Sequence, residues 1–346
     1  MTPSMPPWLM HAQRRFSDGS SKAMRAIQLS QTGGPDVLEV VDLELRAPGP
    51  GEVQVRHRAI GVNFIDTYQR SGLYPMRLPA VLGGEGAGTV EAVGEGVTHL
   101  RIGDRVAYSG GSTGGYAEAA VLKAARAAIL PDTISFETAA AAMLKGMTAE
   151  FLVRRCAPVK PGQTILVQAA AGGVGTILVQ WIKALGGIVI GTVGSEEKAK
   201  LARSLGADHI IFYRDEDVAA KVRDITGGAG VPIAYDSVGA ATFEGTLASL
   251  SKRGVFVSFG NASGPVPPLA PLRLSQAGSV FLTRPTMGDY LVTQAEWDDS
   301  VAALFGVIGS GQVKIEIGQT FPLGDARAAH EALHSRDTIG ATLLIP

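Results

Sequence analysis

A glycine-rich turn is the strongest chemical signal in the sequence. Residues 164–168 read as a strand, and residues 174–185 carry apolar side chains at helical spacing. Between them lies Ala170-Ala171-Gly172-Gly173-Val174-Gly175. Small residues let a pyrophosphate approach the backbone, and the start of the helix offers free N–H groups to it. We therefore expect a dinucleotide-binding turn here; the alternative is an ordinary tight connection between a strand and a helix.

The turn differs from the pattern G-x-G-x-x-G at its first position, where Ala170 stands. A backbone N–H is available from alanine as well as from glycine, so we interpret the turn as a variant of that pattern.

The end of the next strand favours NADPH over NADH. An NAD site places a carboxylate there for the ribose 2′-hydroxyl, but residues 191–195 read Gly-Thr-Val-Gly-Ser. Glu196 and Glu197 follow in the first helical turn, where acids are ordinary. Lys198, Lys200 and the pair Tyr213-Arg214 can attract a 2′-phosphate. The alternative for each lysine is a solvated helix face.

Metal chemistry has one motif in its favour and several observations against it. His330-Glu331-Ala332-Leu333-His334 matches H-E-x-x-H, which on a helix puts two imidazoles on one face. The residues that follow offer only Asp337 as a third ligand, Cys156 is the single cysteine, and Gly83-Gly84-Glu85-Gly86 has no histidine. We therefore expect an amphipathic helix, with Ala326, Ala329 and Leu333 facing inward, and no metal.

A second group of polar residues follows a strand in the first half of the chain. Residues 63–70 are a short helix candidate that brings Asn63, Asp66, Tyr68 and Arg70 to the rim of a loop. Asn63 either caps this helix or contacts a ligand, and the two roles are compatible. We find no Ser/His/Asp or paired-carboxylate constellation, which suits hydride transfer, because there the cofactor carries the chemistry.

The elements that position these residues fall into two classes. Residues 24 to about 125 contain closely spaced strands with glycine turns, such as the alternating stretch 52–60, and predict a small barrel-like domain. After an alanine-rich helix over 137–155, strands and helices alternate, which predicts a parallel sheet covered by helices. Its expected strands are 164–168, 188–193, 209–212, 233–236, 255–259 and, at the edge, 280–283. Six such strands predict a doubly wound sheet.

The C-terminal part changes pattern again. Residues 296–308 read as a helix and residues 341–345 as a strand that returns to the first domain. The sheet domain is then an insertion, and we expect the active site in the cleft between the two domains.

Composition excludes several function classes. The chain has 346 residues, 46% of them apolar and 18% charged, with a formal net charge of -1. This length suits two domains, and the charge balance argues against nucleic acid as the main partner. No apolar run approaches the ~20 residues of a membrane helix.

The N-terminal residues 1–23 allow two interpretations. They contain Arg14 and Arg15 and no acid before Asp18, as in a mitochondrial presequence, but also early prolines. Composition favours a disordered extension and a cytoplasmic protein; a presequence would place it in mitochondria.

Several further motifs resemble one family closely. They are Gly61-Val62-Asn63-Phe64-Ile65-Asp66-Thr67-Tyr68, Leu144-Lys145-Gly146-Met147-Thr148-Ala149, Tyr235-Asp236-Ser237-Val238-Gly239, Ser258-Phe259-Gly260-Asn261 and Thr283-Arg284-Pro285. With the turn at 169–175, they resemble the NADPH-dependent quinone oxidoreductases, the zeta-crystallin-like branch of the zinc-free medium-chain dehydrogenases/reductases. The resemblance runs from about residue 24 to residue 346.

The resemblance implies a domain arrangement and an assembly. A GroES-like catalytic domain is expected over 24–147 and 287–346, and a Rossmann NADPH-binding domain over 148–286. A homodimer, joined through the edge strand at 280–283, is also implied.

The resemblance also implies site residues. Gly172, Gly173, Val174 and Gly175 would line the pyrophosphate, and Lys198, Tyr213 and Arg336 would hold the 2′-phosphate. Asn63, Tyr68, Thr148, Phe259, Gly260 and Asn261 would flank the nicotinamide. Gly194, Ser195 and Ser237 complete the expected cofactor site. Tyr68 or Asn63 would donate to a developing oxyanion, with Arg284 near the substrate.

The expected reaction is hydride transfer from NADPH to a quinone. Two alternatives stay open: reduction of enones or enoyl thioesters, and a non-enzymatic role as a crystallin-like or AU-rich RNA-binding protein. The near-neutral charge argues against RNA.

Overall fold

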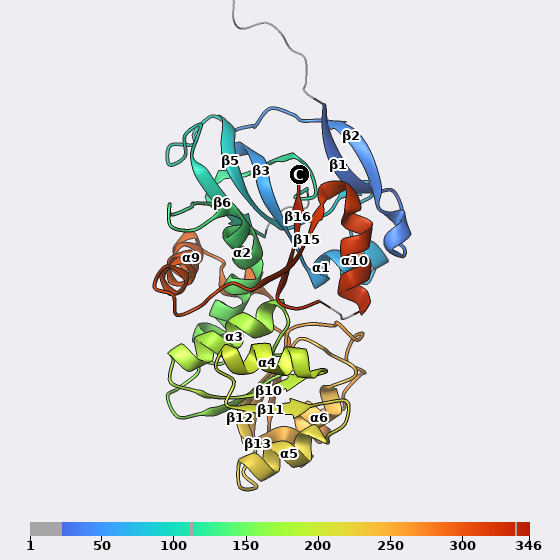
Figure 1. Cartoon of the computed structure of the whole chain (residues 1–346), viewed down its shortest axis with the longest axis vertical. Helices are drawn as coiled ribbons and strands as arrows, with labels where there is room; N and C mark the ends of the chain where they lie inside the picture. The colour runs from blue at the N-terminus through green and yellow to red at the C-terminus, as the bar shows by residue number, and fades with distance from the viewer. Residues whose placement is uncertain (1–22, 111–113, 336–337) are drawn as a thin grey trace, which may run out of the picture.

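The computed structural model describes residues 23–110, 114–335 and 338–346. The expected N-terminal extension up to residue 22, together with Arg336 and Asp337, lies outside the described residues. Figure 1 shows a β-rich part, to which both the N-terminal and the C-terminal residues contribute, above a part built on one large sheet.

The large sheet has six strands in the order β11-β10-β9-β12-β13-β14, and every neighbouring pair is parallel. Its strands are β9 (Thr164–Val167), β10 (Ile188–Val193), β11 (His209–Phe212), β12 (Val231–Asp236), β13 (Leu250–Ser258) and β14 (Phe281–Thr283). The side chains of the strands β9, β10 and β12 are mostly buried, as expected for strands covered on both faces. The order reverses between β9 and β12, which makes the doubly wound arrangement and confirms the predicted fold class.

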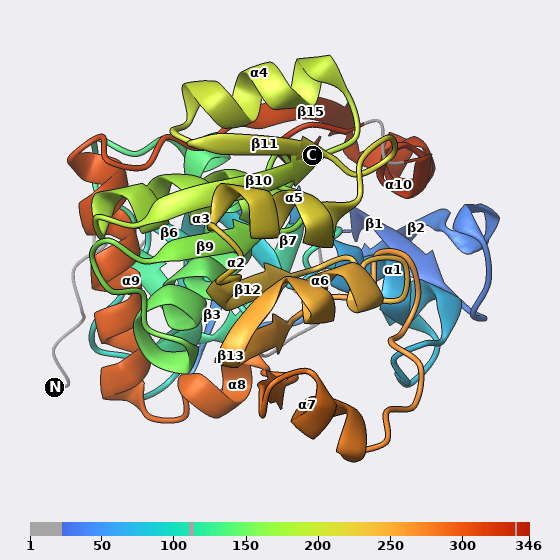
Figure 2. The ribbon, with the colours of Figure 1, turned by 90° about the horizontal axis from the view of Figure 1, so that it is seen from below.

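Helices cover both faces of this sheet, as Figures 1 and 2 show together. α3 packs on β9 and β10 and also contacts α2, whereas α5 packs against α6 on the opposite face. Their bounds are α3 (Gly173–Ala184), α4 (Glu196–Ser204), α5 (Val218–Ile225), α6 (Phe243–Ser249) and α7 (Leu272–Gln276). In such sheets ligands bind at the carboxyl ends of the strands, where the order reverses.

The β-rich part contains a seven-stranded sheet and a three-stranded sheet. The C-terminal strand β16 pairs antiparallel with β3, so residues from the two ends of the chain share one sheet. The elements are β1 (Ala23–Leu29), β2 (Glu39–Glu44), β3 (Glu52–Val62), α1 (Phe64–Ser71), β4 (Ala80–Val81), β5 (Glu85–Val93), β6 (Arg105–Ser109), β7 (Ala119–Lys123), β8 (Ala127–Ile129), β15 (Ile317–Pro322), α10 (Ala326–Ser335) and β16 (Ala341–Ile345).

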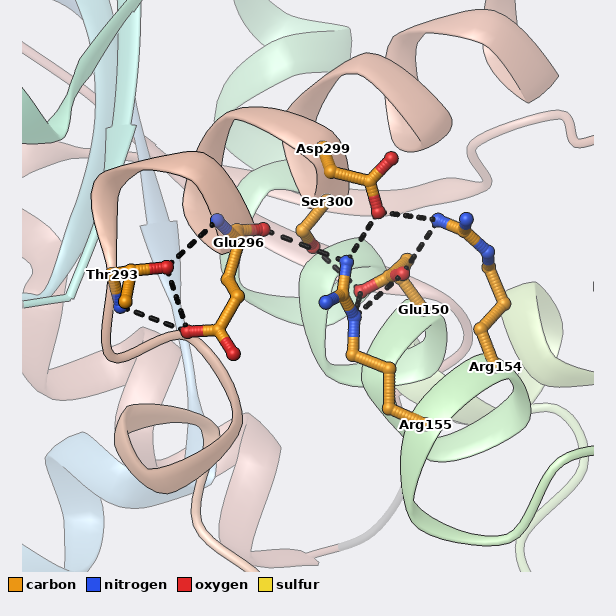
Figure 3. Close-up of polar contacts among 7 residues, drawn as sticks. All are labelled: Glu150, Arg154, Arg155, Thr293, Glu296, Asp299 and Ser300. Carbon is orange, nitrogen blue, oxygen red and sulfur yellow. Dashed lines mark hydrogen bonds and ion pairs between the residues drawn. The ribbon is translucent and has the colours of Figure 1, made fainter.

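Helix α2 (Phe136–Phe151) connects the two parts and contacts β3, β5 and α3. We predicted one helix over 137–155, but the chain turns into a π-helix at Leu152–Cys156. The wider turn lets both Arg154 and Arg155 reach back to Glu150, which is fully buried (Figure 3). The remaining helices are α8 (Met287–Tyr290) and α9 (Gln294–Gly309), and α9 packs along α2.

The expected domain boundary at 147/148 falls inside α2, and the one at 286/287 falls immediately before α8. Over the part of the chain that the structure describes, every helix is too short or too polar to cross a membrane.

Candidate functional site

A cavity of about 670 Å³ lies where the two parts of the molecule meet. Its lining combines residues of α1 from the β-rich part and of the connecting helix α2 with residues at the ends of β9, β10, β12 and β13 of the six-stranded sheet. This volume is within the range of about 300–1,000 Å³ that is usual for ligand pockets. The cavity also lies at the reversal point of the strand order. The sequence analysis expected the active site in the cleft between the two domains.

The glycine-rich turn forms one wall of the cavity. Gly172 is the N-cap of α3, and its N–H donates to the carbonyl of Ala169 at 2.9 Å. A Cβ on Gly175 would stand 2.1 Å from that same carbonyl oxygen, so the close approach of helix and strand requires glycine here. Gly172, Gly173, Val174 and Gly175 all line the cavity, and the first N–H groups of α3 have no partner within the helix.

The acid-free strand end forms one extremity of the cavity. Gly194, Lys198 and Tyr213 line it. Ser195 does not line the cavity but caps α4, accepting the N–H of Lys198 at 3.3 Å. A Cβ on Gly194 would stand 2.6 Å from the Tyr213 hydroxyl, so glycine makes room for that ring.

Two acids at this extremity were not predicted. Glu216 and Asp217 line the cavity next to Tyr213. Glu216 accepts the N–H of Phe212 and pairs with Lys221, and Asp217 caps α5 by accepting the N–H of Ala220. Both carboxylates are therefore held by their own chain segment.

The opposite extremity gathers aromatic and polar side chains. Tyr68, Phe259, Gly260 and Arg284 line it, as do Asn63, Thr148 and Ser237. The Tyr68 hydroxyl accepts the backbone N–H of Asn261 at 2.9 Å, which leaves its own hydrogen for another acceptor. Burial raises the pKa of Tyr68 to about 12, so it stays protonated and can donate.

Tyr74 is a residue of this extremity that the sequence reasoning missed. Its ring meets that of Tyr68 edge to face, with the centroids 5.3 Å apart. Its hydroxyl accepts from Arg284 at 2.9 Å and from the Asn261 side chain at 3.3 Å. Asn261 therefore binds the hydroxyls of both tyrosines, Tyr68 with its backbone and Tyr74 with its side chain. It does not itself line the cavity.

Below the cavity lies a buried ion pair between Glu85 and Lys145. The Lys145 ammonium donates to Oε1 of Glu85 at 2.6 Å, and the backbone N–H of Leu144 donates to Oε2 at 2.6 Å. The side-chain amide of Asn63 donates to Oε1 at 2.8 Å. Asn63, Leu144 and Lys145 line the cavity, whereas Glu85 is fully buried behind them. A Cβ on Gly61 would clash with Glu85.

Asn63 does stand at the N-cap of α1, yet its side-chain amide is directed to Glu85. Thr148 lines the cavity while its hydroxyl donates to the carbonyl of Leu144 at 2.6 Å. Arg336, the third residue expected at the 2′-phosphate, lies outside the described residues.

The H-E-x-x-H motif does not gather two imidazoles. His330 is fully buried in α10 with both ring nitrogens in hydrogen bonds, whereas His334 is exposed. Ala326, Ala329 and Leu333 face inward, as predicted. No cluster of three or more His, Cys, Asp and Glu side chains suited to a metal occurs over residues 23–110, 114–335 and 338–346.

Comparison with known proteins supports the resemblance to the quinone oxidoreductases. Residues 49–132 match the alcohol dehydrogenase GroES-like domain, and residues 173–305 match the zinc-binding dehydrogenase family. The chain is 52% identical to a quinone oxidoreductase of Pseudomonas aeruginosa over 323 residues, 93% of this chain and 99% of that protein. It belongs to the quinone oxidoreductase family.

Two further proteins are similar to this chain over almost its whole length. A quinone oxidoreductase of Escherichia coli, crystallised as a complex with NADPH, is 47% identical with a TM-score of 0.92, covering 93% of this chain and 100% of the other. A 2-haloacrylate reductase of a Burkholderia species is 41% identical over 93% of this chain and 98% of that protein. A solved structure of a 2-haloacrylate reductase, 41% identical, matches with a TM-score of 0.82 over 93% of this chain and 99% of that chain, so it shares this architecture.

Proposed function

We propose that this quinone oxidoreductase reduces quinones by hydride transfer from NADPH in the cavity between its two parts, without zinc. The observation that carries the proposal is the composition of the cavity. One extremity offers Lys198 and Tyr213; the end of β10 carries no acid, and Glu216 and Asp217 there are held by Lys221 and by the N–H of Ala220. The other extremity offers a protonated hydroxyl, Tyr68, beside Arg284. The helix N-terminus of α3 lies between them.

The residues present fit NADPH. Gly172, Gly173 and the following N–H groups of α3 form an anion-binding cradle for the pyrophosphate. Lys198 and Tyr213 lie where the 2′-phosphate of the adenosine ribose would be held. Phe259 and Gly260 would flank the nicotinamide; a Cβ on Gly260 would stand 2.3 Å from the carbonyl of Ser237, so the backbone there is closely packed. When bound, NADPH supplies the hydride.

Tyr68 is our candidate for stabilising the oxygen of the acceptor. Its hydroxyl is fixed by the Asn261 N–H, and its high pKa makes it a hydrogen-bond donor rather than an acid at neutral pH. Arg284, held by Tyr74, adds a positive charge next to the same position. Asn63 has its side-chain amide on Glu85, so we assign it to positioning the nicotinamide side of the cavity.

Reduction of an activated carbon–carbon double bond is the second candidate function. The 2-haloacrylate reductase at 41% identity is the observation that favours it. The same hydride position and the same oxyanion donor serve both reactions, because a quinone is itself a conjugated enone.

We also propose that the protein is a cytoplasmic homodimer. β14 is the last strand of the six-stranded sheet, and Phe281 on it is 63% exposed. A second copy would cover both the unpaired strand edge and this ring. Light scattering on the purified protein tests the assembly: a monomer at micromolar concentration contradicts it.

NADPH oxidation with a panel of acceptors tests the function. The panel contains 1,4-benzoquinone, 9,10-phenanthrenequinone, an enone and crotonyl-CoA. We expect the highest kcat/KM with a quinone and activity that a chelator leaves unchanged. Activity confined to the enone or to crotonyl-CoA would favour the second function, and loss of activity with the chelator would contradict zinc independence.

A further inference from the structure

A chain of buried hydrogen bonds leads from the C-terminal helix α10 to the cavity. Nη1 of Arg70 lies 3.1 Å from Nδ1 of His330, and Nε2 of His330 lies 3.0 Å from the Tyr116 hydroxyl. Tyr116 donates to Oδ2 of Asp66 at 2.9 Å. All four side chains are buried.

The chain ends at a residue of the cavity. The same oxygen of Asp66 accepts the backbone N–H of Asn63 at 2.8 Å. Asn63 lines the cavity. Two carboxylates hold it: Asp66 accepts its backbone N–H, and Glu85 accepts its side-chain amide.

The direction of the hydrogen bonds follows from the donors. A guanidinium can only donate, so Nδ1 of His330 accepts from Arg70 and the ring hydrogen is on Nε2. That hydrogen then points to the Tyr116 oxygen, and the Tyr116 hydrogen points to Asp66. Burial lowers the pKa of His330 to about 3, which keeps its ring neutral as this direction requires. Every donor of the chain is thus directed toward the Asp66 carboxylate.

We propose that Asp66 is a positioning residue for hydride transfer, which acts by holding Asn63 at the cavity, and that the chain Arg70–His330–Tyr116 stabilises its carboxylate form. The proposal rests on the proposed function. It also gives His330 of the H-E-x-x-H motif a role that involves no metal.

The proposal has a consequence for pH. Tyr116, from the loop before β7, contacts Asp66 directly, and the charges of Glu85 on β5 and Lys145 on α2 also act on it. His330 on α10 and Arg70 on the helix of Asp66 are linked to it through Tyr116. Burial, and then the charge of Glu85, raise the pKa of Asp66 to about 7, against the hydrogen bonds from Asn63 and Tyr116. Protonation of Asp66 weakens its hydrogen bond to Asn63, so kcat should fall as the pH drops below about 7.

Tyr116→Phe tests the chain, with Tyr108→Phe as the matched control. Tyr108 is also a buried tyrosine whose hydroxyl bonds a buried histidine, His57 at 2.8 Å, but the chain to Asp66 does not include it. Loss of one hydrogen bond to a carboxylate should move the acid limb of the kcat profile up by about one pH unit in Tyr116→Phe. Tyr108→Phe should leave that limb in place.

Infrared difference spectra of the cofactor-free protein give a readout that is independent of activity. We expect a protonated-carboxyl band that titrates near neutral pH, is absent in Asp66→Asn and has a higher midpoint in Tyr116→Phe. Asp66→Asn should also lower kcat on the order of 10-fold to 100-fold, since small misplacements in an active site have effects of that size.

The outcomes separate the two claims. A wild-type protein without activity toward any acceptor overturns the proposed function and the role of Asp66 in it. An active wild type with an Asp66→Asn variant of equal kcat overturns the positioning role alone. An equal shift of the acid limb in Tyr116→Phe and Tyr108→Phe also contradicts it.

Discussion

Glu85 and Glu150 are two fully buried carboxylates with different surroundings. Glu85 accepts hydrogen bonds from residues of α2, and Glu150 accepts them from the π-helix that continues α2. Glu85 accepts from Lys145, Leu144 and the Asn63 amide, and these three residues line the cavity. Glu150 accepts from Arg154, Arg155 and, at 2.7 Å, the hydroxyl of Ser300 on α9 (Figure 3). None of the residues that bind Glu150 lines the cavity.

Glu85 and Glu150 are both buried and ion-paired, so these two properties alone do not tell which carboxylate serves the cavity. Arg155 also donates to Asp299 at 2.6 Å, so the group around Glu150 joins α2 to α9 and is partly open to solvent. The group around Glu85 joins β5 to α2 and to Asn63 before α1, at the end of the cavity where we propose the reaction. We therefore propose that the group around Glu85 serves catalysis and that the group around Glu150 serves stability.

Glu85→Gln should have the largest effect. A neutral carboxamide leaves the buried Lys145 ammonium without its counter-charge and loosens Asn63, so kcat/KM should fall by about 100-fold or more. Breaking a buried pair also costs about 3–5 kcal/mol of unfolding free energy, so activity must be normalised to folded protein measured by near-UV circular dichroism. Wild-type kcat/KM in the folded fraction would refute the assignment.

Tyr68→Phe should have the next largest effect. It removes the proposed oxyanion donor, for which a loss of about 100-fold in kcat is typical, while the ring stays in place against Tyr74. Steady-state kinetics with a quinone measure this loss, and an unchanged kcat/KM would show that Tyr68 does not stabilise the oxyanion.

Lys198→Ala should change cofactor preference and little else. Removal of one charged contact to the 2′-phosphate should raise the KM for NADPH about 10-fold and leave the KM for NADH almost unchanged. Lys200→Ala is the matched control, since Lys200 is exposed on the same helix and does not line the cavity. Equal effects on both cofactors would remove the 2′-phosphate role of Lys198.

Glu150→Gln should have the smallest effect on catalysis. It should lower the unfolding free energy by about 1–3 kcal/mol, because Ser300 and two guanidinium groups lose their shared charged acceptor. Denaturant unfolding measures this change, and kcat/KM per folded molecule should equal that of the wild type. A loss of kcat/KM comparable to that of Glu85→Gln would abolish the distinction between the two carboxylates.

Local patterns predicted the scaffold of the site well. The strand, turn and helix at 164–185 are local features, and so is the absence of an acid after Val193. Lys198 and Tyr213, which we expected at this strand end, line the cavity. The doubly wound sheet followed from the alternation of strands and helices.

The partners of the site residues could not be predicted in the same way. Glu85 and Lys145 are 60 positions apart, and Arg70 and His330 are 260 positions apart, so no periodicity relates them. Glu85 entered the sequence reasoning only through the lack of a histidine beside it. Tyr74 follows α1 in a loop, where spacing gives no side-chain direction.

Single-turnover oxidation of NADPH by 1,4-benzoquinone, compared among the wild type, Glu85→Gln and Glu150→Gln, tests the central claim most directly. The claim is that the cavity above Glu85 carries out hydride transfer. We predict an observed rate that falls by about 100-fold in Glu85→Gln and equals the wild-type rate in Glu150→Gln. A wild-type rate in Glu85→Gln, or an equal decrease in both variants, would contradict the claim.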